Sequence, residues 1–256
     1  KGRLHYHEAG SGPALLLLHG SGPGVTGWAN FSGNLAFFSR HFRTIILDAP
    51  GYGGSEAREG DPVGVAREAT LALLDALGID RAHIIGNSYG GIVGGHLAAA
   101  HPERVLRYVT IGGIGFNITS NFPNEGLTRL VDFIEHPTRE NIVAWLHSMV
   151  FDTSIITDEL IDMRYKAALD PVTMASSRKM YTRDALRFIA DAIRGPDAAQ
   201  RIDYLARIKA PTLIAWGRDD KVSPLDGALL PMRLVPHAEL HVFPNCGHWA
   251  MIECKD

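Results

Sequence analysis

The sequence is poor in cysteine, with Cys246 and Cys254 as the only two among 256 residues. Two cysteines cannot build a disulfide framework, and they do not stand at a zinc-binding spacing. Such sparse cysteine usage is typical of a reducing compartment. We therefore expect a cytoplasmic protein that holds no metal.

Net charge and long apolar runs are also scarce. The formal net charge of −3 provides no basic surface for nucleic acid or for an anionic membrane. The apolar run at residues 15–18 is far shorter than the ~20 residues that cross a bilayer, and no leader-like pattern opens the sequence. We therefore expect neither nucleic acid nor a membrane as a partner.

The sequence does contain alternating strand-like and helix-like segments. Helices are predicted near residues 65–77 and 92–100, and strands near residues 4–10, 14–20, 43–51, 82–85, 104–113, 211–217 and 238–248. This alternation predicts an α/β fold with a mainly parallel sheet flanked by helices. Residues 115–200 are helical in pattern and rich in Met and aromatic residues, which predicts a helical cap or lid inserted into a core formed by residues 1–114 and 201–256.

The segment "GNSYGG" places Ser88 between two glycines, with Gly86 two residues before it and Gly90 two residues after it. An apolar strand is predicted before this segment and a helix rich in small residues after it. This is the pattern of a G-x-S-x-G nucleophile elbow, in which the serine adopts a strained conformation at a helix N-terminus and the glycines prevent collisions. The pattern predicts that Ser88 is a catalytic nucleophile.

A serine nucleophile needs a general base, and the base needs an acid to orient it. In this fold the acid and then the histidine follow the serine in the chain. His248 comes after the last predicted strand and is the expected base. Asp219 and Asp220 both follow the preceding strand, and their chemistry alone does not separate them. Asp48 precedes the serine and is interpreted as a turn-forming residue.

The developing oxyanion requires backbone donors close to the nucleophile. We expect one from Tyr89, directly after the serine, and one from Ser21 in the glycine-rich segment "HGSGPG". Among the other histidines, His5 and His7 alternate on one strand face without a third ligand, so we expect no metal site there.

Five segments in order, "HGSGPGVTGWANF", "DAPGYGGS", "GNSYGG", "WGRDD" and "CGHWA", resemble the α/β-hydrolase superfamily. The first segment, the asparagine before the nucleophile and the "GHW" ending are more specifically similar to the meta-cleavage product hydrolases. That family hydrolyses a carbon–carbon bond in 2-hydroxy-6-oxohexa-2,4-dienoates formed during the degradation of aromatic rings. The resemblance covers nearly the whole sequence and implies a further helix after its last residues.

The resemblance implies that Ser88, Asp220 and His248 form the triad, because Asp220 has the family's spacing from the glycine of "WG". It also implies a set of substrate-binding residues, namely Gly22, Asn30, Asn87, Arg164 and Trp249. No metal or organic cofactor is implied. The implied partners are a small-molecule dienoate and further copies of the chain, as a homodimer or a larger oligomer. Ser21 and Tyr89 depart from the common family residues, but both would donate through the backbone, so we expect the oxyanion hole to survive.

The expected reaction consumes water and yields 2-hydroxypenta-2,4-dienoate and a carboxylic acid, with His248 moving a proton in a ketonisation that precedes cleavage. One alternative is a carboxylesterase with the same triad, which would have no use for Asn87 and Arg164. Another is a slow ligand receptor that keeps the hydrolase fold. Measured turnover separates the receptor from the enzymes. The sequence leaves open which substituent the substrate carries at C6.

Overall fold

The computed structural model describes residues 2–255, and its centre is a seven-stranded sheet in the order β1-β3-β2-β4-β5-β6-β7. Strand β1 pairs antiparallel with β3, and the remaining pairs are parallel. This arrangement confirms the α/β fold predicted from the sequence. The strands are β1 (Tyr6–Ala9), β2 (Ala14–Leu18), β3 (Arg43–Leu47), β4 (Ala82–Asn87), β5 (Val105–Ile111), β6 (Thr212–Gly217) and β7 (Ala238–Phe243).

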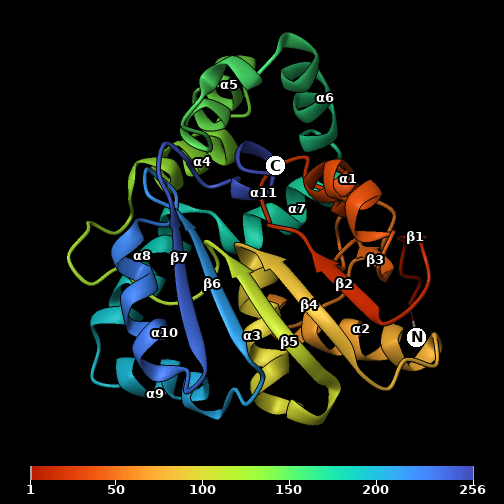
Figure 1. Ribbon diagram of the computed structural model, residues 1–256. Coiled ribbons are helices and arrows are strands. Elements are labelled where there is room, and N and C mark those ends of the chain that lie inside the picture. Colours follow the sequence, from red (N-terminus) through yellow and green to blue (C-terminus); the bar gives the residue numbers. More distant parts are fainter. Residues whose placement is uncertain (1, 256) are drawn as a thin grey trace.

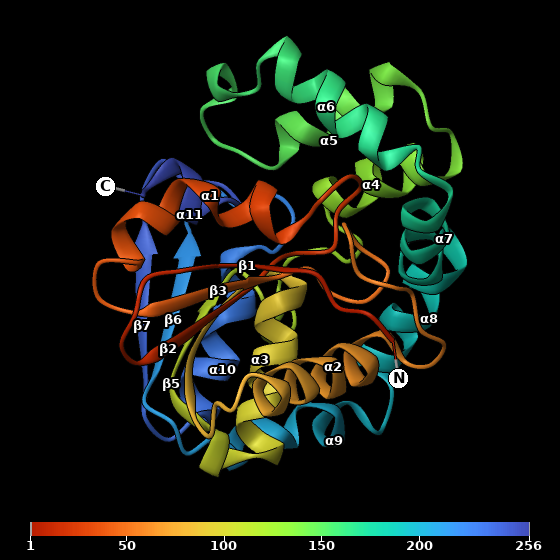
Figure 2. The same ribbon diagram turned by 90° about the vertical axis from the view of Figure 1, so that its right-hand side faces the viewer.

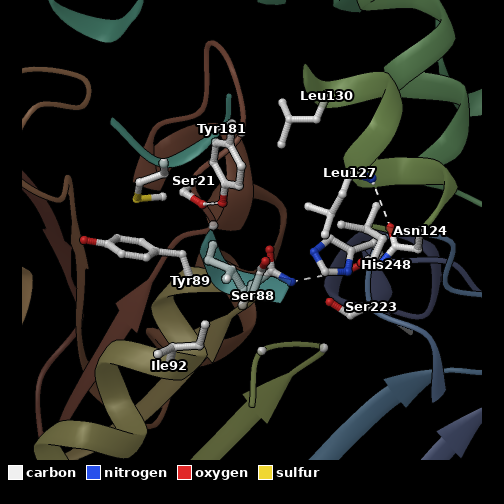
Figure 3. A pocket seen from close by; sticks show the side chains of 18 of the residues that line it. Ser21, Ser88, Tyr89, Ile92, Asn124, Leu127, Leu130, Tyr181, Ser223 and His248 are labelled. Atoms are coloured by element: carbon white, nitrogen blue, oxygen red, sulfur yellow. Dashed lines mark hydrogen bonds between the residues drawn. The ribbon is translucent and has the colours of Figure 1, made fainter. Parts of the chain in front are cut away.

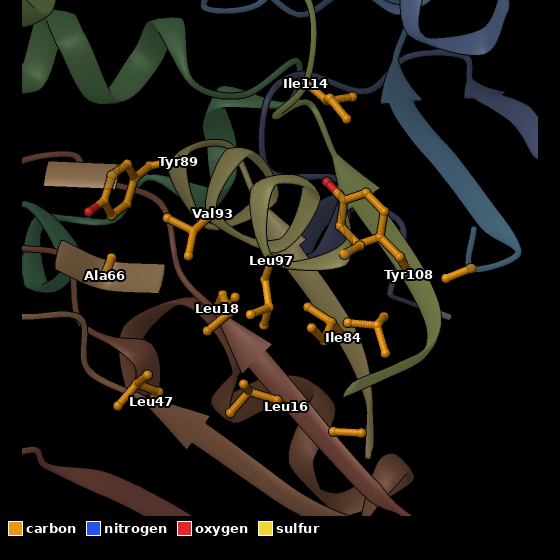
Figure 4. Packing of buried hydrophobic residues seen from close by; sticks show 14 of the residues in the cluster. Leu16, Leu18, Leu47, Ala66, Ile84, Tyr89, Val93, Leu97, Tyr108 and Ile114 are labelled. Atoms are coloured by element: carbon orange, nitrogen blue, oxygen red, sulfur yellow. The ribbon is translucent and has the colours of Figure 1, made fainter. Parts of the chain in front are cut away.

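Helices cover both faces of the sheet, and alternating side chains of β2 contact one face or the other. Leu16 and Leu18 lie in the cluster formed with α2 and α3, as Figure 4 shows, whereas Leu15 and Leu17 lie in the cluster formed with α1 and α11. β2 is therefore buried on both sides, which explains its uninterrupted leucines. The helices that flank the sheet are α1 (Gly27–Phe38), α2 (Pro62–Ala76), α3 (Tyr89–Ala100), α10 (Leu229–Leu234) and α11 (Ala250–Glu253).

Six helices lie between β5 and β6 in the chain, and the first three cover the carboxyl ends of the parallel strands (Figures 1 and 2). Five of the six begin at a polar residue whose side chain accepts a backbone N–H of the first turn, which explains where these helices start. These N-cap residues are Asn124, Thr138, Thr157, Asp170 and Thr182. The helices are α4 (Glu125–Glu135), α5 (Arg139–Ser148), α6 (Asp158–Ala168), α7 (Pro171–Met180), α8 (Arg183–Arg194) and α9 (Ala198–Ile202).

Two of the element boundaries that differ from the sequence expectation bear on the site. Helix α3 begins at Tyr89 rather than near residue 92, because the turn after β4 consists of Ser88 alone. Strand β7 ends at Phe243 rather than near residue 248, because Pro244 and Asn245, which has a φ of 54°, turn the chain away from the sheet. The residues after that turn form the loop that carries His248.

Candidate active site

Ser88 occupies the turn between β4 and α3 with a φ of 52° and a ψ of −118°, a conformation that few non-glycine residues adopt. Its backbone N–H donates to the carbonyl of Ile111 at 2.8 Å, which ties the turn to β5. A Cβ on Gly86 would lie 2.2 Å from the carbonyl oxygen of Gly90, and a Cβ on Gly90 would lie 2.1 Å from that of Leu18. Both positions therefore require glycine, as the elbow pattern predicts.

His248 and Asp220 form a buried pair beside the elbow, and Figure 3 shows His248 on the same part of the pocket wall as Ser88. His248 Nδ1 lies 2.7 Å from Asp220 Oδ2, and the other carboxylate oxygen accepts the N–H groups of Val222 and Ser223, each at 2.8 Å. Because an ionised carboxylate only accepts, Nδ1 carries the hydrogen and Nε2 is left to act as a base.

Asp219, the other candidate acid, points elsewhere. Its carboxylate lies 3.3 Å from a guanidinium nitrogen of Arg218, and its backbone N–H donates to the carbonyl of Cys246. The geometry thus separates two neighbouring carboxylates that sequence chemistry alone left equivalent.

Two glycines after β5 line the pair and the elbow, and sequence reasoning missed both. A Cβ on Gly112, which has a φ of 59°, would lie 3.2 Å from both His248 Nδ1 and Asp220 Oδ2. A Cβ on Gly113 would lie 2.1 Å from the carbonyl oxygen of Ser88. The dipeptide "GG" at the end of the predicted strand 104–113 was the available signal, because close backbone approach is a common reason for such glycines.

The loop after β2 that carries Ser21 is fixed at several points. His19 is fully buried, and its Nε2 accepts the N–H of Ala49 at 2.9 Å, so its Nδ1–H donates to the carbonyl of Gly20. Burial lowers the pKa of His19 below its usual 6.5, which keeps the ring neutral. On the other side of the loop, the hydroxyl of Tyr52 donates to the Ser21 carbonyl at 3.2 Å. The role of His19 was not predicted from the sequence, although it is the first residue of the segment "HGSGPG".

Ser21 also contacts the helical region, by which we mean α4 to α9 and their connections. Its hydroxyl hydrogen-bonds to that of Tyr181, and Figure 3 shows the two groups side by side. Tyr89 follows Ser88 at the first position of α3, where a backbone N–H has no acceptor within its own helix. Its side chain points away from the serine and donates to the carbonyl of Pro62.

Asn30 and Asn87 lie together beneath the nucleophile. Asn87 donates its two amide hydrogens to the carbonyls of Ile111, at 3.1 Å, and His248, at 3.3 Å. Asn30 donates to Asn87 Oδ1 at 3.3 Å and accepts the N–H of Gly20 at 3.2 Å. The two amides therefore connect the oxyanion loop, β5 and the histidine loop, a role that their prediction as substrate-binding residues did not include.

A cavity of about 560 Å³ opens above these groups, and both Ser88 and His248 line it. Arg164 from α6 also lines it, with 2% of its surface exposed and its guanidinium carbon 5.3 Å from the ring centre of Trp249. Within residues 2–255 no group accepts a hydrogen bond from Arg164 Nε or Nη1. Burial lowers the pKa of Arg164 to about 10, so the side chain remains cationic at neutral pH.

The wall of the cavity away from Arg164 is apolar. It is built by side chains from the starts of α2 and α3, from α4 and from the end of α7 through α8. Figures 1 and 2 both show α6 and α8 well apart, so the cation and this apolar wall belong to different parts of the helical region. The wall includes Val63, Ile92, Leu127, Leu130, Met180, Leu186, Phe188 and Ile189.

Gly22, the remaining residue of the predicted substrate-binding set, also lines the cavity. A Cβ at this position would lie 2.6 Å from the indole ring of Trp145 in α5. Glycine is therefore required for α5 to reach the oxyanion loop. The structure thus brings the predicted site residues to the lining of one cavity, except for Asp220, which contacts the lining residue His248.

The α/β hydrolase fold profile matches residues 13–254. The chain belongs to the α/β-hydrolase family. A 2-hydroxy-6-oxo-6-phenylhexa-2,4-dienoate hydrolase of Burkholderia cepacia is 38% identical over 99% of this chain and 87% of its own. A 2-hydroxy-6-oxononadienedioate/2-hydroxy-6-oxononatrienedioate hydrolase of Burkholderia vietnamiensis is 40% identical over 98% of this chain and 86% of its own.

Solved structures place this α/β hydrolase among the same enzymes. A meta-cleavage product hydrolase of Pseudomonas fluorescens superposes with a TM-score of 0.87 at 34% identity, covering 100% of this chain and 90% of its own. A 2-hydroxy-6-oxo-6-phenylhexa-2,4-dienoate hydrolase of Rhodococcus superposes with a TM-score of 0.83 at 29% identity, covering 99% of this chain and 95% of its own. The family resemblance read from the sequence segments is confirmed.

Two further features of this hydrolase concern metals and membranes. Within residues 2–255 no three His, Cys, Asp or Glu side chains gather closely enough to hold a metal ion. Over the same residues, no helix combines the length and the apolar character needed to cross a membrane.

Proposed function

We propose that this α/β hydrolase cleaves the C5–C6 bond of a 2-hydroxy-6-oxohexa-2,4-dienoate, with Ser88, His248 and Asp220 as its catalytic triad. Its relatives and structural neighbours are hydrolases of such compounds. The products would be 2-hydroxypenta-2,4-dienoate and a carboxylic acid, and the reaction consumes one water.

Arg164 is the observation that carries this proposal. A buried cation without an acceptor is costly, and a carboxylate from the ligand would relieve that cost with two hydrogen bonds. The dienoate carries its carboxylate at one end and its reacting carbonyl at C6. Binding the carboxylate at Arg164 and Trp249 would leave the extended ligand to run through the cavity toward Ser88.

The chemistry follows from the placement of His248. A carbon leaving group is poor, so the dienol must first become a ketone, with its hydroxyl proton lost and a proton added at C5. We assign the movement of that proton to His248, and the contact of its Nδ1 with Asp220 Oδ2 supports this role. Ser88 then adds to the C6 carbonyl, or activates the water that does, and the N–H groups of Ser21 and Tyr89 stabilise the oxyanion. As the C5–C6 bond breaks, its electron pair delocalises onto the C2 oxygen, which regains a proton to give the dienol product. If Ser88 carries the acyl group, the one water consumed then hydrolyses it to the carboxylic acid.

The apolar wall favours an uncharged substituent at C6. Among the described lining residues, the basic side chains are Arg164 and Lys179. The ammonium group of Lys179 donates to both carboxylate oxygens of Glu59, each at 3.2 Å. Asp61 lines the same region and adds negative charge. A second carboxylate, which a nonadienedioate carries, would therefore meet apolar side chains and acidic groups. We propose an alkyl or aryl substituent for this enzyme.

The decisive experiment follows the visible absorbance of coloured dienoates mixed with the enzyme. We expect fast loss of the band of the 6-phenyl compound, and kcat/KM at least about tenfold lower for the nonadienedioate, since a buried unpaired charge costs more than 1.4 kcal/mol. Equal kcat/KM values for the two dienoates would contradict the proposal of an uncharged C6 substituent but not the proposed cleavage reaction. Turnover of neither dienoate, together with hydrolysis of a neutral ester, would instead support a carboxylesterase.

Three expectations from the sequence stay proposals. We propose that residues 115–200 act as a cap over the core formed by residues 1–114 and 201–256. We also propose that the enzyme works in the cytoplasm and assembles as a dimer or a larger oligomer. Size-exclusion chromatography with light scattering tests the assembly, and a monomer at micromolar concentration would contradict it.

A further inference from the structure

Glu253 is the last residue of α11. Its two carboxylate oxygens accept hydrogen bonds from two segments that lie about a hundred residues apart in the chain. Oε2 accepts the backbone N–H of Gly247 at 2.8 Å, directly before the catalytic histidine. Oε1 accepts the N–H groups of Phe151, at 2.7 Å, and Asp152, at 3.1 Å, which follow α5. One half-buried side chain therefore joins the histidine loop to the helical region.

The same two segments are in direct backbone contact. The N–H of His248 donates to the carbonyl of Met149 at 2.7 Å. A Cβ on Gly247 would lie 2.7 Å from the Cα of Val150 and 2.8 Å from the carbonyl oxygen of Met149. The histidine loop and residues 149–152 are thus packed too closely to move independently while Glu253 holds them.

Helix α5 also reaches the other side of the catalytic centre. Its Trp145 ring packs against Gly22 of the oxyanion loop, at a distance that leaves no room for a side chain there. Trp145 and Met149 both line the cavity. A shift of α5 caused by a ligand would therefore reach the oxyanion loop through Trp145 and the histidine loop through Met149 and Glu253.

We propose that Glu253 is a positioning residue that fixes the backbone of His248 to residues 149–152, so that the helical region and the general base take up their reactive arrangement together. The inference rests on the proposed triad but not on the dienoate as substrate. A displacement of the base by about 1 Å can slow an enzyme by about a hundredfold. The contact between Glu253 and Gly247 therefore acts on turnover rather than on ligand binding.

The principal variant is Glu253→Gln, which keeps the shape of the side chain. Its NH2 group must face either the N–H of Gly247 or those of Phe151 and Asp152, so it loses the acceptor on one side. Glu253→Asp keeps the charge but is one methylene shorter and can hold one segment at a time. The matched control is Asp226→Asn, because Asp226 accepts the N–H groups of Ile118, Thr119 and Ser120 and holds another strand-to-helix connection away from the histidine.

The measurement is kcat per active site with 4-nitrophenyl acetate and with the 6-phenyl dienoate, after titration of active sites with a fluorophosphonate. We expect Glu253→Gln to lower kcat per site about tenfold for both substrates, with KM within about twofold of the parent. Glu253→Asp should fall between that variant and the parent. Asp226→Asn should keep the parent kcat per site.

A purely structural role would reduce the number of titratable sites and lower Tm without changing kcat per site. Parent-like kcat per site in Glu253→Gln would overturn the proposal, and so would parent-like kcat per site in Glu253→Asp if the glutamine variant does not fold. A slowed ester reaction in a protein that does not cleave dienoates would refute the proposed substrate and leave the role of Glu253 standing.

Discussion

The two walls of the cavity differ in how their functional groups are held. On the sheet side, Ser88, Asp220 and His248 each have backbone hydrogen bonds that fix their position. On the helical side, most of the wall is apolar, and Arg164 has no acceptor for two of its nitrogens among the described residues. The difference teaches that the proposed catalytic groups already have partners within the chain, whereas Nε and Nη1 of Arg164 lack an acceptor among the described residues, as the anionic ligand that we propose would require.

The largest expected effect comes from removing the nucleophile. Ser88→Ala should lower cleavage of the dienoate by about 10⁴-fold or more, because no group replaces the serine at C6. The dienoate should still bind with a shifted absorption band, since His248 and Arg164 remain. His248→Ala should slow ketonisation together with cleavage. Rapid-mixing absorbance traces separate the two steps, and product formation by Ser88→Ala at near the parent rate would refute the assignment of the elbow.

The next largest effect separates the two neighbouring aspartates. Asp220→Asn should reduce kcat by about 10⁴-fold, because an asparagine can hold the imidazole in the wrong tautomer. Asp219→Asn is the matched control and should keep kcat within about twofold, since its half-buried carboxylate contacts Arg218 rather than His248. Steady-state rates of both variants decide the matter. A crippled Asp219→Asn enzyme would exclude Asp220 as the orienting acid.

The smallest expected effect concerns His19 and the loss of folding stability at acidic pH. Burial lowers the pKa of His19 in the folded protein below the 6.5 of the unfolded chain, so the unfolded chain takes up the proton first. Stability should therefore be fully present above about pH 6.5 and should decrease as the pH falls below it. Tm should drop by at least about 2 °C between about pH 7 and pH 5. The half-buried His83 and His96, whose pKa values are also lowered by desolvation, contribute in the same direction.

Calorimetry on two variants tests the contribution of His19. His19→Asn should show a shallower fall of Tm with decreasing pH, although its Tm will be lower throughout because the acceptor for Ala49 is altered. His237→Asn changes an exposed histidine and should keep the parent slope. Equal slopes in all three proteins would show that His19 does not couple protonation to stability.

The sequence predicted those parts of the site that depend on local patterns. The elbow is local, because Gly86 and Gly90 avoid backbone collisions within the same turn and the nearby end of β2. The mainly parallel sheet and the place of His248 after the last strand followed from the alternation of elements and the chain order of the fold. These features require no knowledge of which side chains meet across the sheet.

Contacts between distant segments were beyond the sequence. The chemistry of "WGRDD" does not distinguish the two aspartates; the family spacing implied Asp220, and the contact with His248 that explains this choice is visible only in the structure. Nothing near Asn87 shows that its amide donates to the histidine loop. Glu253 lies in a short segment without a motif of its own, and its partners after α5 are visible only in three dimensions. Chain topology determines such pairs, and one sequence carries no direct record of it.

The most direct test of the central claim is the effect of Arg164→Ala on two substrates. Our account predicts that the variant loses about 2–5 kcal/mol of binding and cleavage with the free dienoate, because the substrate carboxylate loses its buried partner. Hydrolysis of 4-nitrophenyl acetate, which has no carboxylate, should change by less than about threefold. Equal losses of kcat/KM on both substrates would contradict the claim, because they would show that Arg164 supports the helical region and does not bind the ligand.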